Sequence, residues 1–377
     1  MSESVLPVPY VDLSLQYKSI MDKVDKALRE VLLSGTYVLG DRVRIFESEL
    51  ASYCGCAHAV AVGSGSDALA LSLMALGVEW RDEVITTPFT FIATAAAIKR
   101  VGATPVFVDV DDETFNISPT GVHSAITANT RAIVPVHLFG LPVDMTHLLN
   151  LRRTHSLYIV EDAAQAIGGR WNGRIVGALG DAGALSFFPT KTLGGYGDGG
   201  AILSNRDDVQ KIADILRRQG AVKPQVYEYI GTNSRLDTIQ AAILHVKLSY
   251  LDQWLKRRRK IAAVYKELLA GTGLGLPLDG ITSTHTYNQY TIRVPRDRDR
   301  LCAYLNSHQV CTAVYYRTCL HLQPAFQDLN YQEGDFPTAE RLSREVLSLP
   351  CFPEITVHQQ ERVSSLIRRW LGSPRVC

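Results

Sequence analysis

Residues 184–203 read ALSFFPTKTLGGYGDGGAIL, with Lys191 near the middle. Two short apolar runs flank a glycine-rich segment that contains this lysine, which predicts a strand–loop–strand element packed on a core. The glycines allow the backbone to approach a ligand closely. A lysine held in such a place loses contact with water, which lowers the pKa of its amine and favours it as a nucleophile. The stretch therefore suggests a Schiff base between Lys191 and an aldehyde cofactor.

Apolar segments typical of strands alternate with helical patterns along most of the chain. The seven candidate strands are residues 59–62, 83–86, 105–110, 131–136, 157–160, 184–188 and 201–204. The helical patterns cover residues 22–33, 67–76, 94–101 and 207–219. Strands that alternate with helices predict an α/β fold whose mostly parallel sheet is covered on both faces. Ligands are then expected at the carboxyl ends of the strands.

The pattern changes after about Leu236. A long helical stretch runs to Ala270 and is followed by the glycine-rich turn at residues 271–277. The segments beyond that turn, residues 288–294, 297–309 and 339–347, suggest a smaller α+β domain. We therefore predict a large domain over residues 1–250, whose N-terminal segment packs on the small domain, and a small C-terminal domain over residues 251–377.

The 377-residue chain is 46% hydrophobic and 20% charged, and its formal net charge is +1. This is an ordinary globular composition. A charge so close to zero argues against general binding of nucleic acid or of an anionic membrane. The basic run at residues 256–260 lies in an amphipathic helical pattern, so it is expected to be a solvated helix face.

Neither a membrane span nor a secretion signal is expected. No apolar stretch approaches the length of a transmembrane helix, and residues 1–11 lack a basic segment followed by an apolar one. The seven cysteines are irregularly spaced and form no CxxC pair or zinc pattern. We therefore expect reduced thiols, no bound metal and a cytoplasmic location.

Several residues follow predicted strands closely enough to face a ligand. Asp162 would either keep the nitrogen of a pyridine ring protonated or cap the next turn. The run Gly63–Asp67 opens a helix whose free N–H groups suit a phosphate, although a plain helix cap is the simpler explanation. Phe89 and Phe91 would stack on a cofactor ring or pack in the core. His137 would line the pocket or be a structural histidine with satisfied hydrogen bonds.

Three segments together carry a family resemblance. The strand-end sequence EDAAQ (residues 161–165), the run SFFPTKTLGGYGDGG (186–200) and the segment NSRLDTIQAA (233–242) resemble the nucleotide-sugar aminotransferases of the DegT/DnrJ/EryC1/StrS family. These are pyridoxal-phosphate enzymes of fold type I. The resemblance extends to residues 8–13, 320–326 and 347–350 and so covers nearly the whole chain. It implies a large domain with a seven-stranded sheet, a smaller C-terminal α+β domain, and a homodimer.

The resemblance also implies the roles of individual residues. Lys191 is expected to form the Schiff base with pyridoxal 5′-phosphate, and Asp162 to bond the pyridine nitrogen. Asn233 would reach the cofactor phosphate of the neighbouring subunit, so that the two active sites are shared. Arg235 would point into that same site and contact an acidic sugar or the glutamate donor. The remaining cofactor-binding residues that the resemblance implies are Gly65, Ser66, Phe91, Gln165 and Ser186.

Substrate contacts are implied for Tyr316, Arg317 and His321, which fall where the family places sugar-binding residues. The sequence departs from the family here, because residues 315–321 include arginine and cysteine where relatives commonly have prolines. Proline restricts the backbone, so this departure bears on the local chain path and on any contact made by Tyr316 or Arg317.

The implied activity is transfer of an amino group from L-glutamate to a nucleotide-linked keto-sugar, with release of 2-oxoglutarate and passage through pyridoxamine 5′-phosphate. The variants at residues 187–189, 195–198 and 233–237 are most similar to the branch acting at C3 of UDP-linked N-acetyl-3-keto-hexoses or their uronic acids, for cell-surface polysaccharides such as lipopolysaccharide. The alternatives are amination of a 4-keto sugar on a dTDP, GDP or UDP carrier, amination of an aminocyclitol precursor, and a non-enzymatic regulatory module that binds the cofactor. Related dehydratases carry histidine in place of the lysine, so Lys191 argues against that chemistry.

Overall fold

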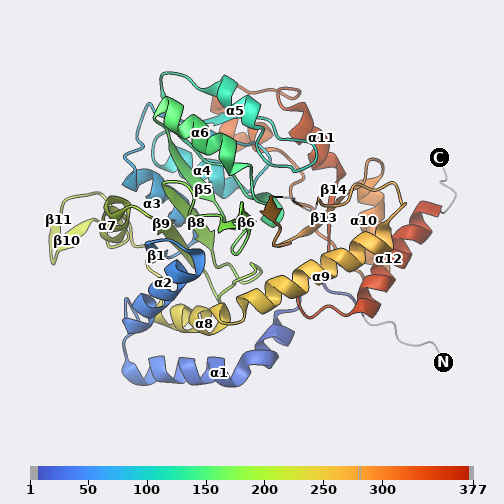
Figure 1. Ribbon diagram of the computed structural model, residues 1–377, viewed down its shortest axis with the longest axis horizontal. Helices are drawn as coiled ribbons and strands as arrows, with labels where there is room; N and C mark the ends of the chain where they lie inside the picture. The colour runs from blue at the N-terminus through green and yellow to red at the C-terminus, as the bar shows by residue number, and fades with distance from the viewer. Residues whose placement is uncertain (1–6, 279, 281, 373–377) are drawn as a thin grey trace.

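The computed structural model describes residues 7–278, 280 and 282–372, and its centre is a seven-stranded sheet with helices on both faces (Figure 1). The strand order is β1-β9-β8-β5-β4-β2-β3. Neighbouring strands from β8 to β3 pair in parallel, whereas β9 is antiparallel to both β1 and β8. The strands are β1 (His58–Val62), β2 (Glu83–Thr86), β3 (Thr104–Phe107), β4 (Thr130–Ile133), β5 (Tyr158–Asp162), β8 (Ala182–Ser186) and β9 (Gly200–Ser204). The predicted α/β fold with a seven-stranded, mostly parallel sheet is therefore confirmed.

Alternate side chains of the strands pack into opposite layers, as a strand covered on both faces requires. Val60 and Ile202 pack on one face with α3, α4 and α7. Ala61 and Leu203 point to the other face, against α2 and α8, and α5 and α6 cover that face further along the sheet. The covering helices are α2 (Asp41–Cys54), α3 (Gly65–Ala75), α4 (Ile92–Arg100), α5 (Pro119–Ala125), α6 (Met145–His155), α7 (Asp207–Leu216) and α8 (Thr238–Leu248).

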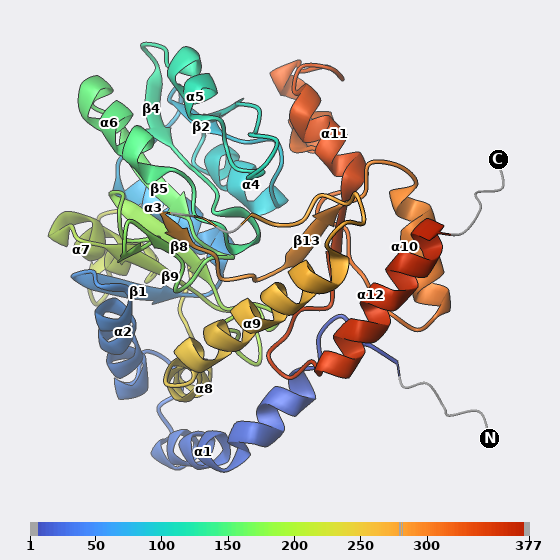
Figure 2. The same ribbon diagram turned by 45° about the vertical axis from the view of Figure 1, so that its right-hand side comes forward.

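A smaller C-terminal unit lies beside the sheet and is joined to it by the long helix α9 (Figure 2). Leu251 and Leu255, in the first turns of α9, pack with α2 and α8 beneath the sheet. Ile261 and Tyr265, further along the same helix, pack in the core of the C-terminal unit. The elements of this unit are α9 (Leu251–Leu269), β13 (Tyr290–Arg293), α10 (Arg298–Ser307), α11 (Pro337–Glu345), β14 (Val346–Leu349) and α12 (Val357–Gly372).

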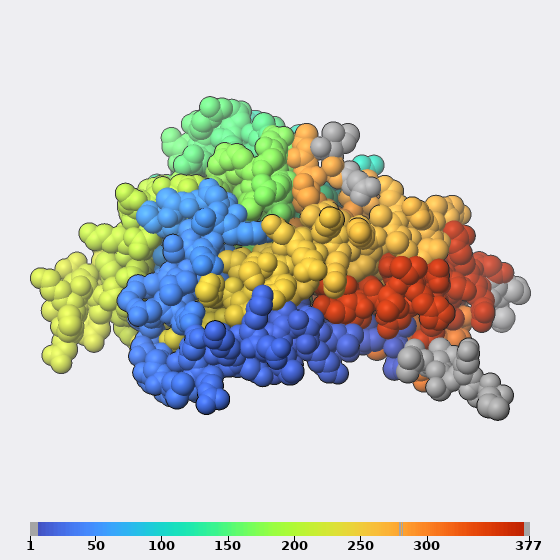
Figure 3. Space-filling view, turned by 60° about the horizontal axis from the view of Figure 1, so that its bottom comes forward, coloured from blue at the N-terminus to red at the C-terminus, as the bar shows by residue number. Residues whose placement is uncertain are grey.

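The N-terminal segment contacts both parts of the molecule. The N–H of Val8 donates to the carbonyl oxygen of Gln309 (2.8 Å), and the Val8 carbonyl accepts from the N–H of Cys311 (2.9 Å). The chain then crosses to the sheet side as α1 (Leu13–Ser34), whose buried face, including Ile20, packs on α8 and α9. Figure 3 shows α1 lying along this side of the molecule, next to α9 and α12.

Short elements complete the described chain. The strands β6, β7 and β12 form a small antiparallel sheet, and β10 and β11 form a hairpin that projects from the edge near α7 (Figure 1). Within the described ranges, no helix is both long enough and apolar enough to cross a bilayer. The short elements are β6 (Arg170–Trp171), β7 (Arg174–Ile175), β10 (Ala221–Lys223), β11 (Val226–Tyr227), β12 (Ser283–Thr284) and the 3₁₀ turns Leu138–Gly140, Leu320–Leu322 and Pro324–Leu329.

The basic run at residues 256–260 differs from its expected form. Arg258 is only 4% exposed, and its Nη1 donates to the carbonyl oxygens of Tyr287 (2.9 Å), Asn288 (3.3 Å) and Cys351 (2.6 Å). It is buried because residues 254 and 261 share its side of α9, at spacings of four and three residues, and that side packs against the rest of the protein. The prediction of a solvated helix face is therefore wrong at Arg258, which instead ties α9 to the segments just before β13 and just after β14.

Candidate active site

A cavity of about 590 Å³ opens at the carboxyl ends of the central strands. Asp162 ends β5 and Ser186 ends β8, and both side chains line the cavity. Gly65, in the first turn of α3, and Phe91, directly before α4, line it from the loops that follow β1 and β2. Lys191 enters from the loop between β8 and β9. The sheet therefore brings residues that are far apart in the sequence to one edge, as expected for an α/β fold.

Lys191 is held by a tight turn. Its N–H donates to the carbonyl oxygen of Phe188 (2.9 Å), and the N–H of Gly195 donates to that of Phe187 (2.7 Å). A Cβ atom at Gly194 would lie 2.3 Å from the carbonyl oxygen of Pro189, so only glycine fits there. Burial lowers the pKa of the Lys191 amine to about 8, against a smaller opposing effect from Asp162. A pKa near neutrality is what a lysine nucleophile or base needs.

Capture of pyridoxal 5′-phosphate by the apo protein should accelerate as the pH rises towards the pKa of Lys191 and level off above it, because only the neutral amine attacks an aldehyde. With a pKa of about 8, about a tenth of Lys191 is neutral at pH 7, roughly 300 times more than for an ordinary lysine. Stopped-flow absorbance between about pH 6 and about pH 10 measures this rate. A rate that keeps climbing through the top of that range would contradict the lowered pKa.

Asp162 is buried and its carboxylate is fixed by two donors. The hydroxyl of Thr94 donates to Oδ2 (2.7 Å), and the N–H of Ala164 donates to Oδ1 (3.2 Å). Burial raises the pKa of Asp162, and the hydrogen bonds from Thr94 and Ala164 oppose that rise. Because Thr94 donates to Asp162, the hydroxyl of Thr90, 3.0 Å from that of Thr94, is the donor of their mutual hydrogen bond. The sequence interpretation missed both threonines, although their spacing of four residues at the start of a helix was visible.

His137 is a structural residue. Its Nδ1 accepts from the N–H of Val143 (3.0 Å), so the proton is on Nε2, which donates to Glu161 (3.0 Å). The Glu161 carboxylate also accepts from the N–H groups of Gly177 (2.7 Å) and Gly180 (2.7 Å). The side chains of His137 and Glu161 are fully buried, and they hold the end of β5 next to Asp162. Of the two interpretations of His137, the structure supports the structural one.

The first turn of α3 has the form of an anion-binding site. Ser64 caps the helix, its Oγ accepting from the N–H of Asp67 (3.1 Å), while Gly65 and Ser66 line the cavity. A Cβ atom at position 65 would lie 2.7 Å from the Cβ of Ser186, so the glycine is needed for this close approach. Free N–H groups and the positive end of the helix dipole suit a phosphate. The run 63–67 therefore combines a helix cap with a first turn that faces the cavity.

Aromatic and amide side chains form another part of the cavity wall. Phe91 lines the cavity and is 55% exposed, with its ring centroid 6.2 Å from that of Tyr316, whereas Phe89 is fully buried in the core. The Oε1 of Gln165 accepts from the N–H of Phe139 (2.7 Å), and its Nε2 donates to the hydroxyl of Tyr316 (3.1 Å). The amide of Gln165 is thereby held in one orientation at the cavity edge.

Two of the expected substrate residues are not in the cavity. Arg317 points to solvent and pairs with Asp299 (2.8 Å). His321 is buried, and its Nε2 lies 3.0 Å from the carboxylate of Glu340. The structure therefore gives no support to the predicted substrate contacts of Arg317 and His321, because each is engaged by an acid outside the pocket.

Asn233 and Arg235 also lie outside the cavity, Asn233 being exposed and Arg235 half-buried. Conversely, the cavity is also lined by residues that the sequence interpretation did not select, among them Phe188, Thr190, Asp198, Gln289 and Tyr315. Tyr315 and Gln289 come from the C-terminal unit, so they reach the site only because that unit packs beside the sheet.

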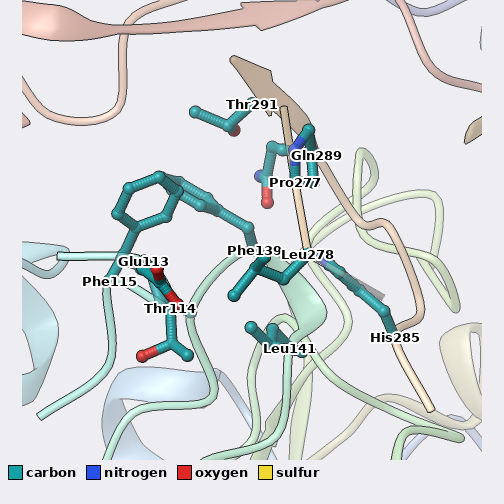
Figure 4. A pocket seen from close by; sticks show the side chains of 11 residues that line it. Glu113, Thr114, Phe115, Phe139, Leu141, Pro277, Leu278, His285, Gln289 and Thr291 are labelled. Carbon is teal, nitrogen blue, oxygen red and sulfur yellow. The ribbon is translucent and has the colours of Figure 1, made fainter. Parts of the chain in front are cut away.

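A second, much smaller crevice lies between the sheet side and the C-terminal unit (Figure 4). Its volume is about 10 Å³, and Phe115, Phe139 and Leu141 form much of its wall. This is space for about one water molecule. The crevice is therefore too small for a cofactor.

The residues of the large cavity fit pyridoxal 5′-phosphate. Lys191 offers an amine for the aldehyde, Asp162 a buried carboxylate for the ring nitrogen, and the turn at Gly65 and Ser66 a phosphate site. Phe91 offers a face for the ring and Gln165 a fixed amide near it. The cofactor, when bound, supplies an electron sink for removing a proton next to the transferred nitrogen.

Comparison with known proteins agrees with this chemistry. The profile of the DegT/DnrJ/EryC1/StrS aminotransferase family matches residues 18–368. The chain is 48% identical to a "Pleiotropic regulatory protein" of Geobacillus stearothermophilus (94% of this chain and 96% of that protein covered). It is 42% identical to a dTDP-3-amino-3,4,6-trideoxy-alpha-D-glucose transaminase of Streptomyces venezuelae (96% and 96%). It is 41% identical to a UDP-N-acetyl-3-dehydro-alpha-D-glucosamine 3-aminotransferase of Acidithiobacillus ferrooxidans (97% and 98%).

Among solved structures, the fold is similar to that of S. venezuelae DesV in complex with a ketimine intermediate. The TM-score is 0.96 at 42% sequence identity, and the match covers 98% of this chain and 100% of that one. The match includes both the sheet and the C-terminal unit. The chain therefore belongs to the DegT/DnrJ/EryC1/StrS aminotransferase family and is a pyridoxal-phosphate-dependent aminotransferase.

Proposed function

We propose that the protein transfers an amino group from L-glutamate to C3 of a UDP-linked N-acetyl-3-keto-hexose or its uronic acid, in the synthesis of a cell-surface polysaccharide. The observation that carries the proposal is the cavity that joins Lys191, Asp162 and the Gly65 turn in a chain so similar to transaminases. The names of both transaminases described above place the amino group at C3, on a dTDP-sugar in one and a UDP-sugar in the other.

We further propose a homodimer in which Asn233 and Arg235 enter the partner's active site. Among the described residues that line the cavity, Lys191 is the only cation, whereas a dicarboxylate donor needs a further positive group. Arg235 lies on a loop fixed through Ser234, whose hydroxyl donates to Asp67 (2.8 Å). The nearby hairpin and the residues just after it expose apolar side chains, including Ile230 at 91% exposure, as expected of a surface that another subunit covers.

The substrate is tested with a panel of keto-sugars and glutamate-loaded enzyme, with the amino-sugar product measured by mass spectrometry. We expect kcat/KM for the 3-keto UDP-N-acetyl-hexose to exceed that for 4-keto dTDP-, GDP- and UDP-sugars by about 10²-fold or more, because a misplaced keto group leaves polar groups unpaired. Preference for a 4-keto sugar, or for an aminocyclitol precursor, would overturn the proposal.

The uronic acid is distinguished from the neutral sugar by a matched pair that differs only in the C6 carboxylate. If Arg235 of the partner binds that carboxylate, Arg235→Ala should abolish any preference for the uronate and leave the rate with the neutral sugar largely unchanged. Equal losses with both sugars would assign Arg235 to the glutamate donor. The half-reaction with glutamate alone separates the two outcomes, because Arg235→Ala should leave it unchanged if Arg235 binds the uronate and slow it if Arg235 binds the donor.

A regulatory module is the second candidate, because the relative at 48% identity is named as a regulatory protein. Such a module would bind the cofactor without turning over any keto-sugar of the panel. Bleaching of the cofactor absorbance by glutamate, followed by its return on addition of the keto-sugar, distinguishes the enzyme from the module.

A further inference from the structure

Lys247 is a buried lysine that the chemistry of the cavity does not use. It lies in the last turn of α8 and is 1% exposed. Its Nζ lies 4.9 Å from the ring centroid of Tyr196 and 5.8 Å from that of Trp254. These are distances at which an ammonium is attracted to the face of an aromatic ring. The main polar interaction of Lys247 is therefore with two rings.

The burial of the Lys247 ammonium carries a cost in folding free energy. Within the part of the chain that the structure describes, no carboxylate oxygen lies within 4.0 Å of its Nζ. Glu354 acts on it electrostatically from the loop after β14, and burial lowers the pKa of the lysine to about 8. A buried ammonium without a paired acid destabilises a fold relative to an apolar side chain of similar length. A role in activity would explain its presence.

Tyr196 links Lys247 to the loop that carries Lys191. It lies five residues after Lys191, between β8 and β9. Its N–H donates to the Oε1 of Gln240 (2.8 Å), and the ring of Tyr17 approaches its ring edge-on at 6.0 Å. Gln240 and Lys247 are seven residues apart on α8 and so share one side of that helix. The helix thus holds the loop at two points, through the backbone of Tyr196 and through its ring.

We propose that Lys247 is a positioning residue, whose ammonium holds the ring of Tyr196 and thereby fixes the loop from which the Lys191 amine reaches the cavity. The backbone of the loop is held by the hydrogen bond from Gly195 to Phe187 and by that from Tyr196 to Gln240, but neither bond orients the side chain of Tyr196. The contact between the ammonium and the ring adds an anchor at that side chain. The role concerns Lys191 itself and holds whichever keto-sugar is the substrate.

The proposal is tested with apo protein by the rate at which Lys191 captures pyridoxal 5′-phosphate, which requires neither donor nor sugar. Lys247→Met keeps the length of the side chain and removes the charge. We expect the capture rate to fall about 10-fold, while the Tm stays the same or rises because an unpaired buried charge is gone. Hydrogen exchange of the amides of residues 192–196 should become faster in this variant.

Matched variants separate the ring from the charge. Tyr196→Phe keeps the ring and should behave as wild type, whereas Tyr196→Leu should slow capture as much as Lys247→Met. The double variant Lys247→Met/Tyr196→Leu should be no slower than either single variant, because both remove the same contact. Lys247→Arg, which retains the cation, should restore most of the rate.

Two kinds of result would overturn the proposal. If Lys247→Met lowers the Tm and the capture rate together, the lysine is only structural. If the two single effects add in the double variant, or Tyr196→Leu behaves as wild type, Lys247 does not act through Tyr196. Neither result bears on the identity of the sugar, because the measurement contains none.

Discussion

Lys191→Ala should abolish transamination, with a fall in kcat/KM of about 10⁴-fold or more. The substitution removes the amine that anchors the cofactor and the group that moves a proton at the reacting carbon. No other described lysine lines the cavity, so the chain offers no substitute. Release of 2-oxoglutarate from glutamate, and the product of the keto-sugar reaction, measure the loss.

Lys211→Ala is the matched control, because Lys211 is an exposed lysine on α7, away from the cavity. It should leave the rate unchanged. Borohydride reduction of the wild-type holoenzyme followed by peptide mass mapping should place the cofactor on Lys191. Its attachment to another residue, or a wild-type rate in Lys191→Ala, would contradict the assignment.

Asp162→Asn should lower kcat/KM by about 10²- to 10³-fold, the usual effect of removing one preorganised electrostatic partner from an active site. The variant keeps the size of the side chain and an oxygen for Thr94, but it loses the negative charge opposite the ring nitrogen. Because Asp162 is buried, water cannot replace that charge. Both half-reactions should slow, which single-turnover absorbance with glutamate and with the keto-sugar measures separately.

Two further variants calibrate this result. Thr94→Val removes the 2.7 Å hydrogen bond to Asp162 but leaves its charge, so its effect should be smaller, about 10-fold. Asp207→Asn changes an exposed aspartate at the start of α7 and should have no effect. An Asp162→Asn enzyme as fast as wild type would show that the carboxylate is not the partner of the ring.

The sheet could be predicted because its strands are covered on both faces. Such strands carry short apolar runs, and all seven were visible in the sequence. The hairpin of β10 and β11 was not, because Val226 and Tyr227 are exposed and leave no pattern of burial. The expected helix from Leu236 to Ala270 is two helices, α8 and α9, separated by Ser249 and Tyr250, which fit a helical pattern equally well.

The site was predictable where it depends on strand ends. Lys191 and Asp162 reach the cavity because the sheet places their loops at one edge. Residues from the C-terminal unit were not predictable in this way, since their positions depend on how that unit packs on the sheet. Tyr316 lines the cavity, whereas Arg317 and His321, from the same segment, find acids elsewhere. Arg258 is a similar case, because the sequence of the basic run does not show which of its residues is buried.

Helix α9 makes the predicted boundary at residue 250 a poor place to divide the protein. A cut there would strip Leu251 and Leu255 from beneath the sheet and leave Val43 and Leu244 without their neighbours. The C-terminal fragment would in turn lose Val8, a residue of the N-terminal segment that packs in the core of the C-terminal unit. Neither half would retain an intact interior, so we expect the two parts to melt in a single calorimetric transition and to be insoluble when expressed apart.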